Sequence, residues 1–361
     1  MSISQSKDYL FLKLAFYQAE INLGSTSLNP SVGCVIVKNN SVISSGRTSF
    51  NGRPHAEAIA LKKNVNFKGS ILYSTLEPCS HYGKTPPCVK KIIYKKLNKV
   101  IFSINDIDKR SKNMAHKHLK KANIKVKRFT HKIYAEKFYK SYFLQSSKKI
   151  PYIDAKLAIS NDYFSINKKE KSITNKTSRN VGNFLRSKYD CILSTSKTIN
   201  DDNSKLDCRI EGLEQKSPAV VILDRLFKIK KNLKVFKNKT REVFIFTQSN
   251  NRDKEEYFKK MGINIIKLTK SSNLKDEVSE IYLFLKQFGF NRILVESGVR
   301  YINEILKYNL IQNFYLFKSS SNLKKNGKNN TKINLIKKLK TTIKNKVRIN
   351  LFDDTLFKIQ L

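Results

Sequence analysis

The chain has 361 residues, which is too long for one average domain and suits two domains of about 150 to 200 residues each. Its 71 Lys and Arg residues outnumber 28 Asp and Glu residues and give a formal net charge of +43. Because this charge is mostly Lys, accompanies abundant Asn and Ile, and runs from end to end, it is typical of a solvated surface and disfavours a dedicated nucleic-acid site.

The first half of the chain alternates predicted helices and strands, which indicates a layered α/β domain. Leu10, Leu14 and Tyr17 lie at helical spacing and predict a first helix that ends at Gly24. The first predicted elements are a helix over residues 7–23, a β-hairpin over 31–46 with its turn at 38–40, and a helix that starts near 55. A strand within residues 69–79 follows and ends at 77–78. A helix over 86–97 and a strand over 99–104 complete the series.

The polar string QSSKKIP at residues 145–151 is the best candidate for a linker, and we place the domain boundary between residues 147 and 148. The Lys-, Asn- and Ser-rich segment 318–345 predicts a mobile surface region. Six short apolar runs of strand length predict a mostly parallel sheet covered on both faces. They lie at residues 151–160, 190–195, 219–224, 242–246, 263–268 and 292–297.

Five cysteines are an odd and sparse set, which argues against a disulfide scaffold and for a reducing compartment. The N-terminus has no continuous apolar segment followed by a cleavage site, and no run of about 18 apolar residues occurs. We therefore expect a cytoplasmic protein without a membrane span.

His55-Ala56-Glu57, Pro78-Cys79 and Cys88 are the strongest signal in the sequence. A catalytic zinc takes three protein ligands of nitrogen or sulfur type and keeps one position open for water, and His55, Cys79 and Cys88 supply such a set. Glu57 lies two residues after a ligand on the first turn of a helix, from where it reaches the metal-bound water without ligating the metal. This arrangement is the signature of zinc nucleobase deaminases, in which the Glu moves the protons.

Each of these residues alone has an ordinary explanation, because a lone Cys is usually a small buried hydrophobe and a lone His a satisfied polar group. The joint occurrence of the His-x-Glu, Pro-Cys and Cys elements favours the zinc site. Cys34, Cys191 and Cys208 have no such companions, so we interpret them as structural residues.

Eight residues, SHYGKTPP, separate Cys79 from Cys88, where nucleoside and tRNA deaminases usually have two. Together with NPSVGCVIV and HAE, the string PCSHYGKTPPC resembles the bifunctional deaminase/reductases of riboflavin biosynthesis. The resemblance implies a cytidine-deaminase-like α/β/α zinc domain over residues 1–147 and a dihydrofolate-reductase-like α/β domain over residues 148–361. It also implies Zn²⁺ and NADPH as cofactors and a homodimer formed through the reductase domain.

In that family the N-terminal domain deaminates 2,5-diamino-6-ribosylamino-4(3H)-pyrimidinone 5′-phosphate, and the C-terminal domain then reduces the ribosyl group to ribityl. The resemblance assigns the substrate side of the deaminase pocket to Asn29, His81 and Lys84. In the second domain it assigns substrate binding to Arg186, Leu206, Arg209 and Glu296. It places Ala158, Thr198, Asp202 and Gly298 against the nicotinamide cofactor.

The chain departs from the family pattern at several positions. Thr48 stands near the place of a His before the HAE motif, and the Asp-Pro-Asn-Pro stretch appears as NDIDKRSKNMAHK, which keeps Asp106. In the second domain the usual Ser-Leu-Asp-Gly becomes residues 160–163, Ser-Asn-Asp-Tyr, and Ser172 replaces an expected Trp. The Pro and Gly residues expected near SSSNLKKNG are absent. All of these changes leave the zinc motif intact.

Three other hypotheses remain open at this stage. The chain could be a deaminase whose C-terminal half is a structural or dimerising domain, and stoichiometric NADPH binding would exclude this. It could be an RNA-editing base deaminase, which predicts RNA binding that falls steeply with salt. It could also be a binding module without enzymatic activity, but this hypothesis does not explain why Glu57 lies beside a complete set of zinc ligands.

Overall fold

The computed structural model describes residues 3–128, 132–148, 151–269, 274–339 and 345–361. The chain divides into two compact units, residues 1–150 and residues 151–361, and each unit is described by itself. The predicted linker includes residues 149 and 150, which lie outside the described residues. Within the described ranges, no helix is both long enough and apolar enough to cross a bilayer.

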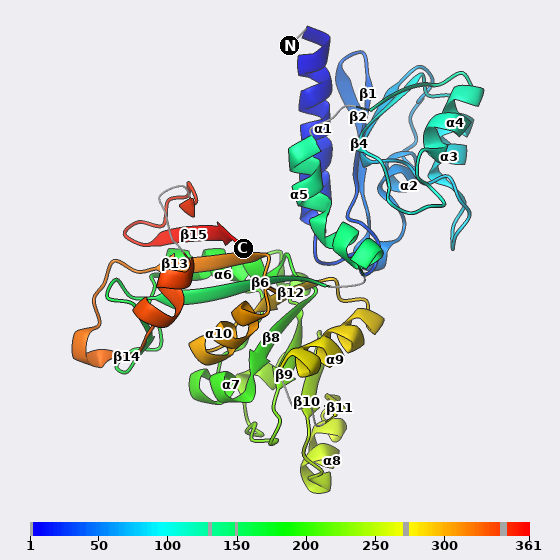
Figure 1. The fold of residues 1–361 in the computed structure, drawn as a ribbon. Helices are drawn as coiled ribbons and strands as arrows, with labels where there is room; N and C mark the ends of the chain where they lie inside the picture. Colours follow the sequence, from blue (N-terminus) through cyan, green and yellow to red (C-terminus); the bar gives the residue numbers. More distant parts are fainter. Residues whose placement is uncertain (1–2, 129–131, 149–150, 270–273, 340–344) are drawn as a thin grey trace. The chain divides into compact units, whose positions relative to one another are not determined.

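The N-terminal unit is built on a five-stranded sheet of order β2-β1-β3-β4-β5 (Figure 1). Strand β1 is antiparallel to β2 and β3, whereas β3, β4 and β5 run parallel. The elements are α1 (Ile3–Ile21), β1 (Gly33–Lys38), β2 (Ser41–Arg47), α2 (Ala56–Ala60), β3 (Ile71–Leu76), α3 (Cys88–Tyr94), β4 (Lys99–Ile104), α4 (Met114–Lys121), β5 (Lys125–Arg128) and α5 (Lys132–Phe143).

Helices cover both faces of this sheet. Alternate residues of each strand point to opposite faces, so Val35, Tyr73 and Ile101 pack on α1. The opposite face packs on α2, α3 and α4 (Figure 1). This sandwich confirms the predicted α/β layering and buries the strands on both sides.

The predicted hairpin is present, with a two-residue turn between β1 and β2. Asn39 and Asn40 have φ values of 49° and 62°, both in the left-handed region. A two-residue turn with two positive φ values matches the twist of the flanking strands, and Asn tolerates this conformation well.

The first helix buries a different face from the apolar stripe noted in the sequence. Leu10, Leu14 and Tyr17 are 53%, 42% and 48% exposed. The helix instead packs Leu12 and Phe16, with the small residues between them, against the sheet. Small residues let the helix approach closely: a β-carbon at Gly33 of β1 would lie 1.8 Å from a carbonyl oxygen of α1.

The C-terminal unit is built on an eight-stranded sheet of order β11-β10-β9-β8-β12-β6-β13-β15, in which only the β13–β15 pair is antiparallel. A small second sheet pairs β14 with β7. The strands are β6 (Tyr152–Ile159), β7 (Phe164–Asn167), β8 (Cys191–Thr195), β9 (Ala219–Leu223), β10 (Val243–Thr247), β11 (Asn264–Lys267), β12 (Arg292–Val295), β13 (Asn313–Lys318), β14 (Gly327–Asn330) and β15 (Thr355–Gln360). The helices are α6 (Lys176–Arg186), α7 (Ser196–Asp202), α8 (Arg252–Lys260), α9 (Leu274–Gln287), α10 (Val299–Lys307) and α11 (Lys337–Leu339).

All six apolar runs form strands of this sheet, which is mostly parallel and covered on both faces, as predicted. Helices α9 and α10 pack on one face, and α7 and α8 contribute Ile199 and Phe258 to the core on the other face. The interpretation of segment 318–345 as surface is wrong in part, because Leu335 and Leu339 are buried in the main core. Residues 340–344 of that segment lie outside the described part of the chain.

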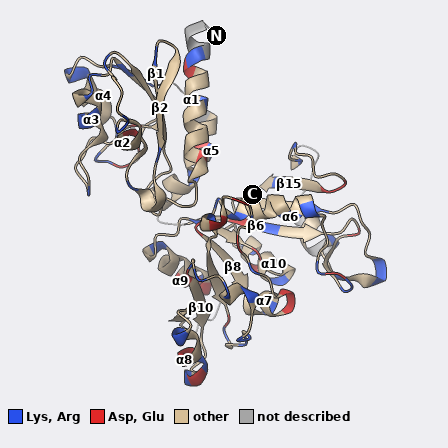
Figure 2. Ribbon diagram, turned by 180° about the vertical axis from the view of Figure 1, so that it is seen from behind, with Lys and Arg blue, Asp and Glu red and all other residues tan. Residues whose placement is uncertain are grey.

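The positive charge is distributed over both units. Lys and Arg residues appear on many helices and loops of each unit (Figure 2). This spread agrees with a generally basic, solvated surface.

Candidate functional site

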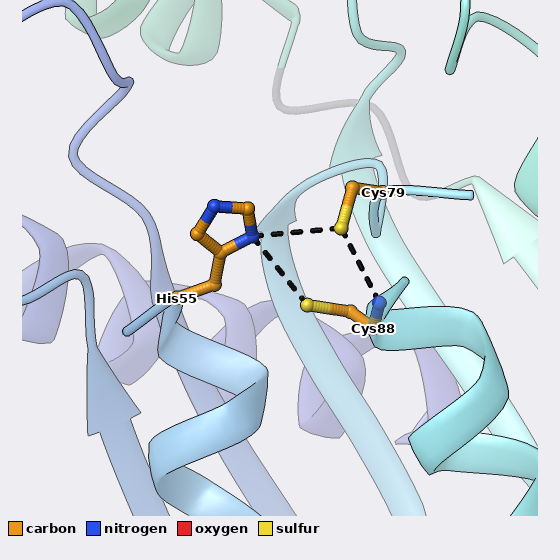
Figure 3. A group of neighbouring side chains, drawn as sticks. All are labelled: His55, Cys79 and Cys88. Atoms are coloured by element: carbon orange, nitrogen blue, oxygen red, sulfur yellow. Dashed lines mark hydrogen bonds between the residues drawn. The ribbon is translucent and has the colours of Figure 1, made fainter. Parts of the chain in front are cut away.

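The three predicted zinc ligands come from three separate elements and meet at one point (Figure 3). His55 is the N-cap residue of α2, Cys79 lies three residues beyond the end of β3, and Cys88 is the first residue of α3. The Nδ1 atom of His55 lies 3.5 Å from Cys79 Sγ and 3.6 Å from Cys88 Sγ. Their ligand atoms all lie within 4.8 Å of one another, a spacing that one metal ion can bridge.

The chemistry of this donor set fits zinc. A hydrogen bond with the Cys88 thiol lowers the pKa of the Cys79 thiol to about 4, against the opposing effect of burial. The backbone N–H of Cys88 also donates to Cys79 Sγ at 3.3 Å. A thiolate beside a second thiol and an imidazole nitrogen is the kind of set that binds zinc and leaves a fourth position open.

Glu57 is buried next to the metal ligands, with only 3% of its surface exposed. Burial and then the charge of Cys79 raise the pKa of the Glu57 carboxyl. The Ser74 hydroxyl donates a hydrogen bond to Glu57 Oε1 at 3.3 Å and holds the carboxylate in place. A buried carboxyl with a raised pKa beside a metal site is suited to accept a proton and return it.

The pocket in front of the metal ligands includes two of the three residues assigned to its substrate side. Asn29 and His81 line it, whereas Lys84 is exposed and is not among the lining residues found in the described chain. Thr48, which replaces the family His, holds the Asn29 segment: it accepts from Val32 N–H at 2.9 Å and donates to Pro30 O at 3.2 Å.

A buried carboxylate, which the sequence analysis missed, shapes the far wall of this pocket. Glu77 accepts hydrogen bonds from the backbone N–H groups of Asp106, Asn113 and Ala115 at 3.1 to 3.3 Å. These bonds fix the loop between β4 and α4, which carries Asp106 into the pocket. The sequence did contain a signal for this role, because Glu77 lies directly between an apolar strand and Pro78. A carboxylate buried at such a position needs hydrogen-bond partners, since burial without them is costly.

The second group of predicted residues gathers at the carboxyl ends of the parallel strands in the C-terminal unit. Arg186 ends α6, and Glu296 follows β12. The guanidinium donates to Glu296 Oε1 from Nε at 2.7 Å and to Oε2 from Nη2 at 3.0 Å. This edge of a parallel sheet is the usual ligand-binding edge in α/β folds.

A lysine that the sequence analysis missed completes this ionic cluster. Lys156 Nζ lies 3.8 Å from Glu296 Oε2, and burial lowers the pKa of Lys156. Burial alone would raise the pKa of Glu296, but the charges of Arg186 and Lys156 outweigh it and lower the pKa to about 2. A Lys inside an apolar strand run was the available signal, because Lys is almost never buried without a partner.

Two of the predicted cofactor residues contact each other at the N-terminus of α10. The Gly298 N–H donates to Thr198 Oγ1 at 3.0 Å, and Gly298 is the N-cap residue of this nine-residue helix. Arg300 follows in the first turn and is exposed. Free N–H groups of a first turn next to an arginine fit the phosphate groups of a dinucleotide such as NADPH.

The remaining predicted residues lie on neighbouring segments. Asp202 ends α7 and is exposed, and Ala158 is half-buried on β6, on the same strand face as Lys156. Leu206 is buried, and its carbonyl oxygen accepts from Arg241. Arg209 donates to Asp207 Oδ1 at 2.5 Å and is 45% exposed.

The altered turn after β6 is closed by its own side chains. The Ser160 hydroxyl donates to Asp162 Oδ1 at 2.5 Å, and Asp162 accepts from the N–H groups of Leu323 and Lys324. Tyr163 stands where the family has Gly and has a φ of 71°, in the left-handed region. The centroid of its ring lies 4.8 Å from Lys318 Nζ, which is a cation–π contact.

The fold and the metal site define a zinc-dependent deaminase domain joined to a second, parallel α/β enzyme domain. Residues 5–104 match the cytidine and deoxycytidylate deaminase zinc-binding region, and residues 151–323 match the RibD C-terminal domain. The riboflavin biosynthesis protein RibD of Buchnera aphidicola is 32% identical over 328 residues, which cover 86% of each chain. The chain therefore belongs to the RibD family, which joins deaminase and reductase activities for riboflavin biosynthesis and uses Zn²⁺ and NADPH.

Other relatives agree with this family. The riboflavin biosynthesis protein RibD of Aquifex aeolicus is 30% identical over 313 residues, with 86% of each chain covered. A solved structure from Thermotoga maritima, a diaminohydroxyphosphoribosylaminopyrimidine deaminase/5-amino-6-(5-phosphoribosylamino)uracil reductase, matches with a TM-score of 0.81 at 26% identity over 99% of both chains. The RibD structure of Acinetobacter baumannii has the same fold, with a TM-score of 0.80 at 24% identity over 99% of both chains.

We expect Cys88→Ala to lower zinc affinity by more than about 100-fold, because it removes a direct ligand, whereas loss of an outer-shell partner already costs about 10- to 100-fold. The purified wild type is expected to hold about one zinc per chain. Metal content after dialysis against a chelator measures the difference. Cys208→Ala, at a buried thiol of the other unit, is the matched control and is expected to keep its zinc. Full zinc retention by Cys88→Ala would contradict the assignment.

Proposed function

We propose that the chain deaminates 2,5-diamino-6-ribosylamino-4(3H)-pyrimidinone 5′-phosphate and then reduces the ribosyl group to give 5-amino-6-(ribitylamino)uracil 5′-phosphate. The observation that carries this proposal is the convergence of His55, Cys79 and Cys88 beside the buried Glu57. The printed activities of the Thermotoga maritima relative support the choice of substrate.

In the deaminase step, Glu57 is the catalytic residue and moves the protons. Water adds to the ring carbon that bears the amino group, and the C–N bond to that group then breaks to release ammonia. Glu57 takes a proton from the water and hands it to the departing nitrogen, which its raised pKa permits. Bound zinc, held by His55 and the two cysteines, supplies the Lewis acidity that lowers the pKa of water toward neutrality. Asn29 orients the pyrimidine, His81 contacts the substrate from the same pocket, and the exposed Lys84 is not among the lining residues found in the described chain.

In the reductase step, the residues of the chain bind and orient the two reactants. NADPH supplies the hydride that C1′ of the ribosyl group receives. Arg186 and Arg209 hold the substrate phosphate, Leu206 lies beside it, and Glu296 faces the substrate. Four residues would hold the cofactor: Ala158 near the end of β6, Thr198 and Asp202 on α7, and Gly298 at the start of α10.

The proposal extends to how the activities are distributed and where they act. Residues 1–147 carry the deaminase and residues 148–361 the reductase. The protein works in the cytoplasm, which the sparse, unpaired cysteines support. It forms a homodimer through the reductase domain, and light scattering on the purified protein tests this state.

We expect purified protein with the phosphorylated diaminopyrimidine to release ammonia and then consume NADPH in equal molar amount. Ammonia release and NADPH oxidation are followed separately, so the two steps are distinguished. Ammonia without NADPH consumption would mean that the C-terminal unit is structural or dimerising rather than a reductase. A zinc-loaded protein that releases no ammonia would contradict the proposed substrate.

A further inference from the structure

The deaminase pocket has a charge imbalance that an anionic substrate must overcome. Four carboxylates line it, and two arginines oppose them; the carboxylates are Glu57, Glu77, Asp106 and Asp108. One arginine, Arg110, is held by Asp108 through Nη2 at 2.6 Å and Nε at 3.0 Å, so its charge is already matched. A phosphate would be repelled from this pocket unless another cation receives it.

Arg53 is a cation suited to this role. It lines the pocket, and the salt bridges found among the described residues do not involve it. Its Nη1 donates to the Thr85 hydroxyl at 2.8 Å, which directs the guanidinium toward the segment between Cys79 and Cys88. A guanidinium has five N–H donors, so this one bond leaves donors for a phosphate.

A second donor faces the same corner of the pocket. A β-carbon added at Gly83 would lie 3.5 Å from Arg53 Nη2 and 3.9 Å from His81 Nε2. Gly83 therefore borders both side chains at this corner, and a methyl group there would be in ordinary contact with each. His81 Nδ1 is bonded to the Ser111 hydroxyl at 2.8 Å. When that hydroxyl donates, the imidazole carries its proton on Nε2 and offers an N–H to the corner.

We infer that Arg53, together with Gly83 and His81 Nε2, forms the subsite that binds the 5′-phosphate of the deaminase substrate. This inference rests on the proposed function. It assigns the phosphate contact to Arg53, which precedes the cis-proline before the first metal ligand, and not to Lys84, which the resemblance placed on the substrate side of the pocket. Lys84 is exposed and is not among the residues that line the pocket in the described chain. Arginine suits the inner position because it binds phosphate oxygens with two parallel hydrogen bonds.

The test compares ammonia release from the phosphorylated substrate and from its dephosphorylated riboside in the zinc-loaded, full-length protein. Arg53→Ala is expected to raise KM for the phosphorylated substrate by about 10- to 100-fold, since charge-assisted bonds are lost, with little change in kcat. The riboside is expected to react equally well with the wild type and the variant. Arg53→Lys is expected to restore part of the affinity, and Gly83→Ala to raise KM for the phosphorylated substrate by filling the corner.

Arg47→Ala is the matched control, because Arg47 ends β2 and bonds Gln18 away from the pocket. Zinc content and NADPH oxidation report whether each variant is folded. An unchanged KM for the phosphorylated substrate in Arg53→Ala, or an equal loss on both substrates, would overturn the subsite. If the wild type itself releases no ammonia from the phosphorylated substrate, the proposed function fails, which is a distinct result.

Discussion

Replacing Glu57 by Gln is expected to lower the rate of ammonia release by about 100- to 10,000-fold, the usual contribution of a positioned general acid–base group. The amide has nearly the shape of the carboxylate but cannot take the proton from water or return it to the leaving nitrogen. The site around it should survive, because the Ser74 hydroxyl can donate to the amide oxygen as it does to Glu57 Oε1. Ammonia release from the phosphorylated diaminopyrimidine measures the effect.

Two further readouts separate lost chemistry from a damaged fold. Zinc content is expected to stay at the wild-type level, because Glu57 is not one of the three ligands. NADPH oxidation with the deaminated intermediate is also expected to be unchanged. Glu136→Gln, an exposed position on α5, is the matched control and should leave ammonia release intact. Near-normal deamination by Glu57→Gln would remove Glu57 from its proposed role.

Replacing Glu296 by Gln is expected to abolish most of the reductase activity and to destabilise the C-terminal unit. Arg186 would lose the charge that compensates it in a site where its side chain is only 12% exposed, and breaking such a pair costs roughly 3–5 kcal/mol. Without Glu296 the Arg186 guanidinium is expected to move from its present position. A displacement of about 1 Å in an active site can lower the rate about 100-fold, so we expect a loss of this size in NADPH oxidation. Urea unfolding and NADPH oxidation with the deaminated intermediate measure the two effects.

The stability effect has a defined pH dependence. The pKa of Glu296 is lowered to about 2 in the folded chain, from about 4.3 for an unperturbed Glu. The carboxylate therefore stabilises the fold fully above pH 4.3, and this stabilisation is lost as the pH falls toward 2. The difference in unfolding free energy between wild type and Glu296→Gln should shrink over that range. Glu304→Gln breaks an exposed pair with Lys307 on α10 and is expected to change stability by less than about 1 kcal/mol.

The metal site was predictable because its chemistry constrains the sequence locally. A histidine at a helix start, Glu57 two residues later and two cysteines beside a strand end and a helix start specify both the ligands and the elements that carry them. The strands of the C-terminal unit were predictable for a similar reason, since a parallel sheet buried on both faces requires continuous apolar runs.

What the sequence did not show depends on contacts between distant segments. Helix α1 has two apolar faces, and only packing against the small residues of β1 decides that Leu12 is buried and Leu10 exposed. Strand β15 lies beyond a Lys- and Asn-rich stretch and pairs with β13 only in three dimensions. Arg53 and Glu77 gain their roles from loops that approach them, 30 or more residues away in the sequence.

Because both units belong to one polypeptide, every molecule that a cell makes carries one deaminase site and one reductase site. Their molar ratio is therefore fixed at synthesis and cannot be adjusted by separate expression. Any imbalance between the two steps has to be corrected by the turnover numbers of the sites themselves. A mutation that slows one site would then let its substrate accumulate, and making more of the protein would raise both capacities together without restoring the balance.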